Sequence, residues 1–292
     1  MMTRTIGAGA DVLMAATSDA APVLQLPHRV QTYLDALVGA CAAVGPPPVS
    51  VILFGSTVRG GFSDISDVDI VIVLPDEATR EDKGRIRDEA ARLEAVHGFR
   101  PAAARAIGAL QARVERAVGH LFACLVCTRG ELLSGDVARV VDLRPWEAPF
   151  VDRIVFASII ASAVTVRGED LLPRIPVPPV RRLDVFKALF ACGGQAWLSV
   201  ATFPVLPDAT KYAMGALKHS LHSCFFCYHG RTASLEEEVD FFDRRLGGNR
   251  TLAQLLSLRR QYRRSFTFAI RCMPVVVRLH LLTAREIRFA RN

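Results

Sequence analysis

Lysine is rare in this 292-residue sequence, although the chain as a whole is basic. Its 36 Lys and Arg residues include only four lysines, and the formal net charge is +7. A basic balance suits an anionic partner such as a nucleotide or nucleic acid, but it does not define a fold. Lysine is a compact point charge that suits a phosphate, whereas arginine is a planar fork. Three of the four lysines, Lys187, Lys211 and Lys218, lie close together, so this stretch is a candidate phosphate-binding region.

The sequence also lacks internal repeats and an export signal. Residues 1–25 contain no sustained apolar core, so we expect a cytoplasmic protein with no membrane partner. The longest uncharged run, 188–207, includes two glycines, a glutamine and two prolines, which favours a buried helix followed by a loop over a membrane span. Seven cysteines, an odd number, are expected to be reduced thiols. With 51% hydrophobic and 22% charged residues, the composition excludes a disordered chain.

Hydrophobic periodicity divides the chain into three parts. Residues 1–26 read as a flexible leader. Residues 27–146 alternate between helical and strand patterns, with helices expected at 27–44, 78–97 and 102–118 and strands at 49–54, 68–74 and 120–127. From 147 to 292 helical patterns dominate, at 147–167, 183–202, 209–229, 234–246, 251–264 and 266–290. We therefore expect an α+β fold, in which a small mixed-sheet domain is followed by an all-helical domain.

Two carboxylates stand at the start of the second strand, in the segment LFGSTVRGGFSDISDVDIVIVL (53–74). Residues two apart on a strand share a face, so Asp67 and Asp69 are expected to point one way while Val68 and Ile70 point into the core. Two like charges side by side repel, and each raises the pKa of the other. A divalent cation between them removes that cost, and Mg²⁺ takes one or two carboxylates together with water and substrate phosphates.

A Gly-Ser turn follows the first strand of the same segment. Gly55 allows the backbone to turn tightly and to approach a ligand, and Ser56 can open a short helix over STVRGG. A phosphate-binding turn next to a metal-binding carboxylate pair is what phosphoryl and nucleotidyl transfer require, because that chemistry is mostly positioning and charge neutralisation.

The run FGSTVRGGFSDISDVDIVIV resembles the signature of the DNA polymerase β-like nucleotidyltransferase superfamily. It is especially similar to the aminoglycoside adenylyltransferases and the minimal nucleotidyltransferases. The resemblance implies metal-dependent transfer of a nucleoside monophosphate from an NTP, with ATP expected, and release of pyrophosphate. It also implies that Asp67 and Asp69 hold Mg²⁺ or Mn²⁺, and that Gly55 and Ser56 bind the β- and γ-phosphates. Arg59 is a further candidate phosphate ligand.

The sequence departs from this family at the third carboxylate, which relatives supply from a later strand. The expected strand GHLFACLVC has no Asp or Glu in its apolar run. His120 stands at its start, Glu115 precedes it, and Glu131 lies beyond its end. The sequence therefore leaves two alternatives open: an altered mechanism, or a descendant that binds nucleotide without turnover.

The helical half carries a basic stripe. Lys211, Gly215, Lys218 and His222 fall on one face of the helix expected at 209–229. In relatives a helical domain closes the cleft and gives a Lys or Tyr to the nucleotide, which makes Lys211, Tyr212 and Lys218 the candidate nucleotide-binding residues.

The acceptor is open from the sequence. One interpretation is a small-molecule transferase acting on a hydroxyl; a second is a transferase acting on tRNA or protein, as in toxin–antitoxin or defence systems. A third is a regulatory nucleotide-binding protein without turnover. Two CxxC pairs, at 124–127 and 224–227, lie inside apolar runs, which favours buried thiols over zinc ligands.

Overall fold

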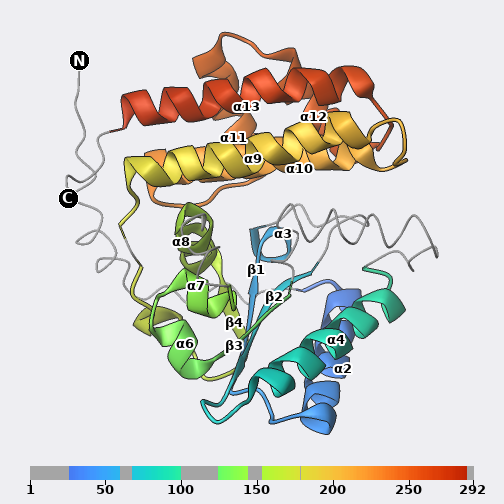
Figure 1. The fold of residues 1–292 in the computed structure, drawn as a ribbon, viewed down its shortest axis with the longest axis vertical. Coiled ribbons are helices and arrows are strands. Elements are labelled where there is room, and N and C mark those ends of the chain that lie inside the picture. Colours follow the sequence, from blue (N-terminus) through green and yellow to red (C-terminus); the bar gives the residue numbers. More distant parts are fainter. Residues whose placement is uncertain (1–25, 60–67, 100–123, 144–152, 178, 288–292) are drawn as a thin grey trace. The chain divides into compact units, whose positions relative to one another are not determined.

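A computed structural model describes residues 26–59, 68–99, 124–143, 153–177 and 179–287 (Figure 1). These residues form two compact units. The first, here called the sheet unit, comprises described residues 26–143 and 162–177. The second, the helical unit, comprises described residues 153–161 and 179–287.

The sheet unit is built on a mixed four-stranded sheet in the order β3-β2-β1-β4. The strands are β1 (Ser50–Phe54), β2 (Asp69–Leu74), β3 (Cys124–Thr128) and β4 (Val164–Gly168). β1 pairs antiparallel with both β2 and β4, whereas β2 and β3 run parallel. The mixed sheet with a helical C-terminal region confirms the α+β fold that the sequence predicts.

Helices α2 (His28–Val44) and α4 (Arg80–Val96) cover one face of the sheet, and α6 (Arg129–Leu133) and α7 (Val137–Val140) lie beside β3 on the other (Figure 1). Val68, Ile70 and Ile72 are fully buried in one cluster with apolar side chains of α2 and α4, as the alternation along β2 predicts. At the N-terminus of α4, Thr79 and Asp82 form a reciprocal capping box. The one-turn helix α3 (Ser56–Arg59) follows β1.

The fourth strand of the sheet corrects the sequence-based expectation of one helix over 147–167. Helix α8 (Arg153–Ser162) ends at Ser162, and β4 follows and pairs along β1. The run Val164-Thr165-Val166 is β-branched throughout, and such side chains lose rotamer freedom in a helix but fit a pleated strand. The sheet unit therefore takes an edge strand from a segment where the sequence predicts only helix.

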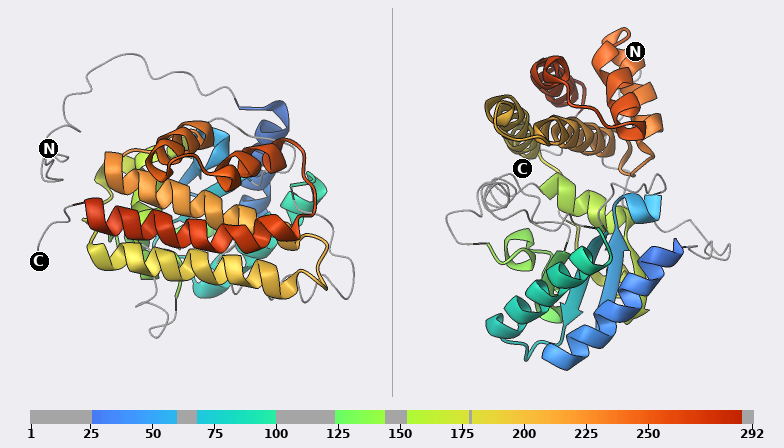
Figure 2. Two further views of the ribbon diagram at one scale, coloured as in Figure 1. Left: turned by 90° about the horizontal axis from the view of Figure 1, so that it is seen from above. Right: turned by 90° about the vertical axis from the view of Figure 1, so that its right-hand side faces the viewer.

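The helical unit has its core between three long helices that run alongside one another (Figure 2). Its elements are α8, α9 (Arg182–Thr202), α10 (Ala209–His229), α11 (Leu235–Leu246), α12 (Arg250–Arg260) and α13 (Phe266–Glu286); the short helix η3 (Leu172–Arg174) lies in the proline-rich segment of the sheet unit. Ser234, Asn249 and Ser265 cap α11, α12 and α13 through their side-chain oxygens. By length and composition α13 could cross a membrane, and 44% of its apolar window is buried in the structure. Its Phe268, Cys272 and Val276 belong to the apolar core of the helical unit.

Candidate active site

The centre of the candidate site is the contact between Gly55 and Asp69. β1 and β2 are antiparallel and Phe54 is opposite Asp69, so the end of one strand lies beside the start of the other. Gly55, the next residue, has φ +72°, in the left-handed region that glycine adopts without strain. A Cβ added to Gly55 would lie 2.8 Å from Cγ of Asp69 and would overlap its Oδ2. Two features therefore require glycine at position 55: its left-handed backbone angle and the Asp69 carboxylate that packs against it.

Helix α3 begins directly after this glycine. The Val58 N–H donates to the carbonyl of Gly55 at 3.3 Å, which closes the turn. The backbones of Ser56 and Arg59 lie in α3, while their side chains are outside the described residues. Thr57 is 7% exposed, and its hydroxyl has no hydrogen-bond partner among the residues that the structure describes. The sequence analysis did not single out this buried hydroxyl beside the turn, although Thr57 is the third residue of the Gly-Ser-Thr motif.

Only one of the two predicted metal ligands is within the described residues. Asp69 is half-buried at the first position of β2, between the buried side chains of Val68 and Ile70. Asp67 lies outside the described residues, so its placement on the same face stays a prediction. Within the described ranges no group of three or more His, Cys, Asp or Glu side chains could hold a metal ion. A site with one or two carboxylates still fits Mg²⁺, which completes its shell with water and phosphate oxygens.

Glu131 is excluded as the third carboxylate by its position in the sheet. β3 runs parallel to β2, with Cys124 beside Ile70 and Thr128 beside Leu74, so the start of β3 is level with Asp69. Glu131 follows the far end of β3, and five residues of strand span roughly 16 Å. The described strand, Cys124–Thr128, contains no acidic residue. His120 and Glu115 lie outside the described residues.

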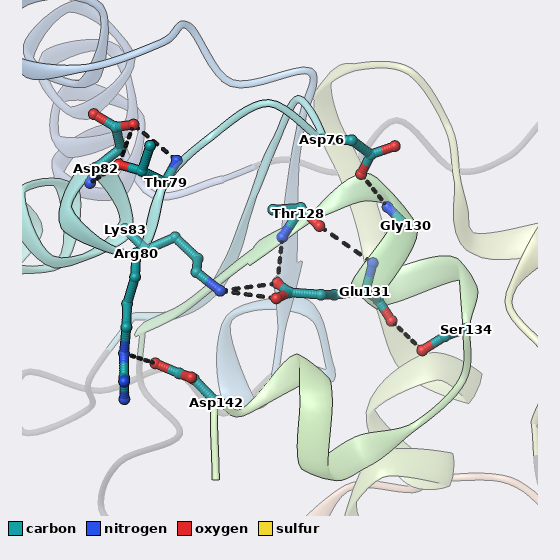
Figure 3. Close-up of polar contacts among 10 residues, drawn as sticks. All are labelled: Asp76, Thr79, Arg80, Asp82, Lys83, Thr128, Gly130, Glu131, Ser134 and Asp142. Atoms are coloured by element: carbon teal, nitrogen blue, oxygen red, sulfur yellow. Dashed lines mark hydrogen bonds and ion pairs between the residues drawn. The ribbon is translucent and has the colours of Figure 1, made fainter. Parts of the chain in front are cut away.

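Glu131 also has a structural role at its own end of the sheet (Figure 3). Its carboxylate accepts hydrogen bonds from the Lys83 ammonium at 2.8 and 3.2 Å and from the Thr128 N–H at 2.8 Å. Lys83 is almost fully buried. Glu131 supplies the counter-charge to an ammonium that would otherwise be buried and unpaired. Nearby, Asp76 accepts from the Gly130 N–H at 2.6 Å and joins the β2–α4 turn to α6.

The three candidate nucleotide-binding residues of the helical unit lie on α10. Lys211 pairs with Asp208 at 3.1 Å, and its ammonium is 5.3 Å from the ring centroid of Tyr262. Tyr212 is 3% exposed, on the core side of the helix. Lys218 is half-buried. Gly55 and Asp69 belong to the sheet unit, so the joining of the two sets in one site stays a prediction.

Other polar side chains of the helical unit pack against the basic stripe of α10. A Cβ on Gly215 would lie 2.8 Å from Nε2 of Gln195 in α9, so the glycine makes room for a buried amide. Nδ1 of His222 is 2.5 Å from a carboxylate oxygen of the fully buried Glu238 in α11. Gln195 and Glu238 were not predicted, because the periodicity of one helix does not reveal which residues of other helices contact it.

Comparison with known proteins supports the class of protein that the Gly55 turn and the Asp69 carboxylate indicate. A family model described as a nucleotidyltransferase domain matches residues 34–99, the segment that contains α2, β1, β2 and α4. The resemblance to nucleotidyltransferases seen in the sequence is thereby confirmed. No curated protein matches the chain.

Among solved structures, the chain is similar to the spectinomycin adenyltransferase AAD(9) from Enterococcus faecialis, whose crystal structure contains ATP and spectinomycin. The match has a TM-score of 0.51 and 9% sequence identity, and it covers 90% of this chain and 100% of that one. At this identity the likeness establishes the fold, including the helical region, and not the substrate.

Proposed function

We propose that the protein is a metal-dependent nucleotidyltransferase that transfers a nucleoside monophosphate from an NTP to a hydroxyl group of a small molecule. The observation that carries the proposal is the left-handed turn at Gly55 against the carboxylate of Asp69. Such a turn lets a triphosphate approach the backbone, while a carboxylate at the same point can share a cation with it. The nucleotidyltransferase domain matched over 34–99 contains both residues.

The residues take the following roles. Gly55 and Ser56 bind the β- and γ-phosphates, and Arg59 assists. Asp67 and Asp69 hold Mg²⁺ or Mn²⁺, which when bound neutralises phosphate charge during the transfer. The acceptor oxygen forms a bond to the α-phosphorus as the bond to the bridging oxygen of the β-phosphate breaks. Pyrophosphate leaves, and the hydroxyl proton passes to a base or to water.

The helical unit contributes to the nucleotide in this proposal. Lys211 and Lys218 supply positive charge for the phosphates, and Tyr212 supports their helix. Lys211 already pairs with Asp208 at 3.1 Å, an exposed pair worth at most about 1 kcal/mol. A triphosphate carries more charge than one carboxylate, so it can compete for this ammonium.

ATP is the proposed donor and a small polar molecule the proposed acceptor. The fold likeness extends over the full length of a protein whose structure contains ATP and spectinomycin, which supports this choice. We place the enzyme in the cytoplasm, where NTPs are available. A tRNA or protein acceptor is the alternative, and nucleotide binding without turnover is favoured by the absence of a carboxylate in the described part of β3.

The test is incubation of the full chain with each α-labelled NTP and Mg²⁺ or Mn²⁺, with a cell lysate as acceptor pool. The pool is separated by size into small molecules and macromolecules, and spectinomycin is added in a parallel reaction. We expect pyrophosphate release and label in the small-molecule fraction with ATP. Asp69→Asn is expected to abolish both, whereas Asp88→Asn, at an exposed position of α4, should retain them.

The outcomes separate the three interpretations. Label in the macromolecular fraction would establish the tRNA or protein acceptor instead. Metal-dependent ATP binding without pyrophosphate release, lost in Asp69→Asn, would establish a binding protein. Absence of metal-dependent binding of any NTP would overturn the proposal.

A further inference from the structure

Helix α9 has an exposed apolar face in addition to its buried one. Ala188, Cys192 and Ala196 pack into the unit's own apolar clusters. On the other side four large apolar residues are exposed: Leu183 (63%), Phe186 (41%), Phe190 (77%) and Trp197 (64%). A helix that is apolar all round is normally buried. None of the three exposed rings contacts another aromatic ring or a cation within the part of the chain that the structure describes.

The exposed residues follow the spacing of a helix–helix seam. Leu183, Phe190 and Trp197 are spaced seven residues apart, like successive a positions of a heptad repeat. Phe186, three residues after Leu183, takes the d position between the first two. Between Phe190 and Trp197 the corresponding d position is Gly193, and a second glycine, Gly194, follows it. The face therefore has two large rings separated by a gap of glycine backbone.

Packing among the described residues does not account for Gly194. A Cβ on Gly194 would meet no described atom within 4 Å, and its φ is not in the left-handed region. Glycine in the middle of a helix costs about 1 kcal/mol relative to alanine. Unlike other open helical glycines such as Gly84, Gly194 lies between two exposed rings, those of Phe190 and Trp197. A glycine at that point lets the backbone of a second helix approach closely, because any side chain would hold the two helices apart.

We propose that this face is the contact between two copies of the chain, with α9 of one copy crossing α9 of the other in antiparallel orientation at Gly193-Gly194. A two-fold axis at the glycine pair is midway between Phe190 and Trp197, so Phe190 of each copy meets Trp197 of its partner. The same axis brings Phe186 opposite the small, exposed Ala201. The spacing of large and small residues is thus self-complementary.

The charges of α9 agree with the antiparallel arrangement. Arg182 and Lys187 lie in the first two turns, and the only acidic residue, Asp184, is buried and caps the helix. Parallel pairing would place the basic residues of both copies side by side. Antiparallel pairing separates them to opposite ends of the seam.

The area is sufficient for a specific contact. From their exposed fractions, the four side chains present roughly 500 Å² per copy, since a fully exposed aromatic side chain offers on the order of 200 Å². Two copies would bury roughly 1,000 Å², the lower bound for a biological interface.

The experiment measures the mass of the purified full chain by sedimentation over a concentration series. We expect a reversible dimer, with Trp197→Ala weakening it by at least about tenfold in Kd. Val96→Ala, at an equally exposed apolar residue of the sheet unit, should have no effect. Gly194→Leu is the decisive variant: it adds apolar surface and favours the helix, yet it blocks close approach, so we expect it to give a monomer.

Other outcomes overturn the proposal. A wild-type monomer at all concentrations would do so. A dimer that Gly194→Leu strengthens would show non-specific hydrophobic association. Flotation of a monomeric wild-type chain with vesicles of phosphatidylserine and phosphatidylcholine, retained in Gly194→Leu, would assign the face to a lipid surface. Circular dichroism confirms that each variant is folded.

Discussion

The carboxylate of Asp69 occupies the space where Gly55 would carry a side chain. The Asp69 Cγ is 2.8 Å and its Cβ 3.1 Å from the position of an added Cβ on Gly55. The two residues are fourteen positions apart in sequence, and the antiparallel pairing of β1 with β2 brings them together. A phosphate bound at the Gly55 turn would therefore lie next to the carboxylate that we propose binds its counter-cation.

Replacing Gly55 by alanine should disable the site more than it destabilises the fold. The left-handed backbone costs alanine roughly 1–2 kcal/mol. The new methyl group must also displace the Asp69 carboxylate, and a displacement of about 1 Å at a reacting centre can cost 100-fold in rate. We expect kcat/KM for nucleotidyl transfer to fall at least about 100-fold, measured by pyrophosphate release.

Gly84→Ala is the matched control. Gly84 lies inside α4, and a Cβ there would meet no described atom within 4 Å. Alanine should stabilise the helix by about 0.5–1 kcal/mol and leave transfer unchanged. Equal activity of the two variants would contradict the assignment of Gly55 to the site.

Glu131→Gln tests whether this carboxylate is structural. Glutamine keeps the size of the side chain but leaves the buried Lys83 ammonium without a counter-charge. We expect the free energy of unfolding to fall by about 1–3 kcal/mol in urea titrations, with transfer by the folded fraction unchanged. Glu77→Gln, at an exposed position, should change neither. Loss of transfer in a folded Glu131→Gln variant would restore Glu131 as a catalytic candidate.

The sequence predicted the parts of the fold in which local pattern and tertiary context agree. A strand was expected at 68–74 and a helix at 78–97, and β2 and α4 are present there. The motif placed the Gly55 turn and Asp69 next to each other on adjacent strands, whereas their direct contact is seen only in the structure. β4 was missed because five residues at a sheet edge carry too weak a signal beside a long helical pattern.

The helical unit shows the limit of sequence reasoning. The periodicity of α10 places Lys211, Lys218 and His222 on one face, but it does not indicate that Gln195 and Glu238 pack there. Contacts between helices depend on crossing angles and on which faces meet, and single-helix periodicity contains neither. Similarly, the sequence of α9 predicts a buried helix, and only the structure shows that one of its apolar faces is exposed.

The seven cysteines should differ sharply in reactivity. None forms a disulfide; six are buried and Cys124 is half-exposed. Burial raises the pKa of the Cys127 thiol to about 12 and that of Cys41 to about 11, so neither supplies thiolate at pH 8. We expect a chromogenic disulfide reagent to label one thiol of the native protein and seven in urea, with the native signal lost in Cys124→Ser. Rapid labelling of two or more native thiols would contradict the packing of these residues.

His280 should make the helical unit sensitive to acid. Its ring is buried in α13, where Nδ1 is 2.9 Å from the carbonyl of Val276, and Nε2 has no hydrogen-bond partner among the described residues. Burial lowers its pKa from 6.5 to about 4. Between these two values the unfolded chain binds a proton that the folded chain does not, so the free energy of unfolding falls as the pH drops. The full loss below pH 4 is about 3 kcal/mol.

His280→Leu removes this acid-dependent loss of stability, because leucine has no group that binds a proton. Urea titrations at pH 7 and pH 5 should show a smaller loss of stability for the variant than for the wild type, by about 2 kcal/mol. The comparison of two pH values cancels any packing difference that is independent of pH. His28→Leu, at an exposed histidine, is the control and should track the wild type. An equal acid loss in wild type and His280→Leu would show that other groups, and not this buried imidazole, set the acid stability of the fold.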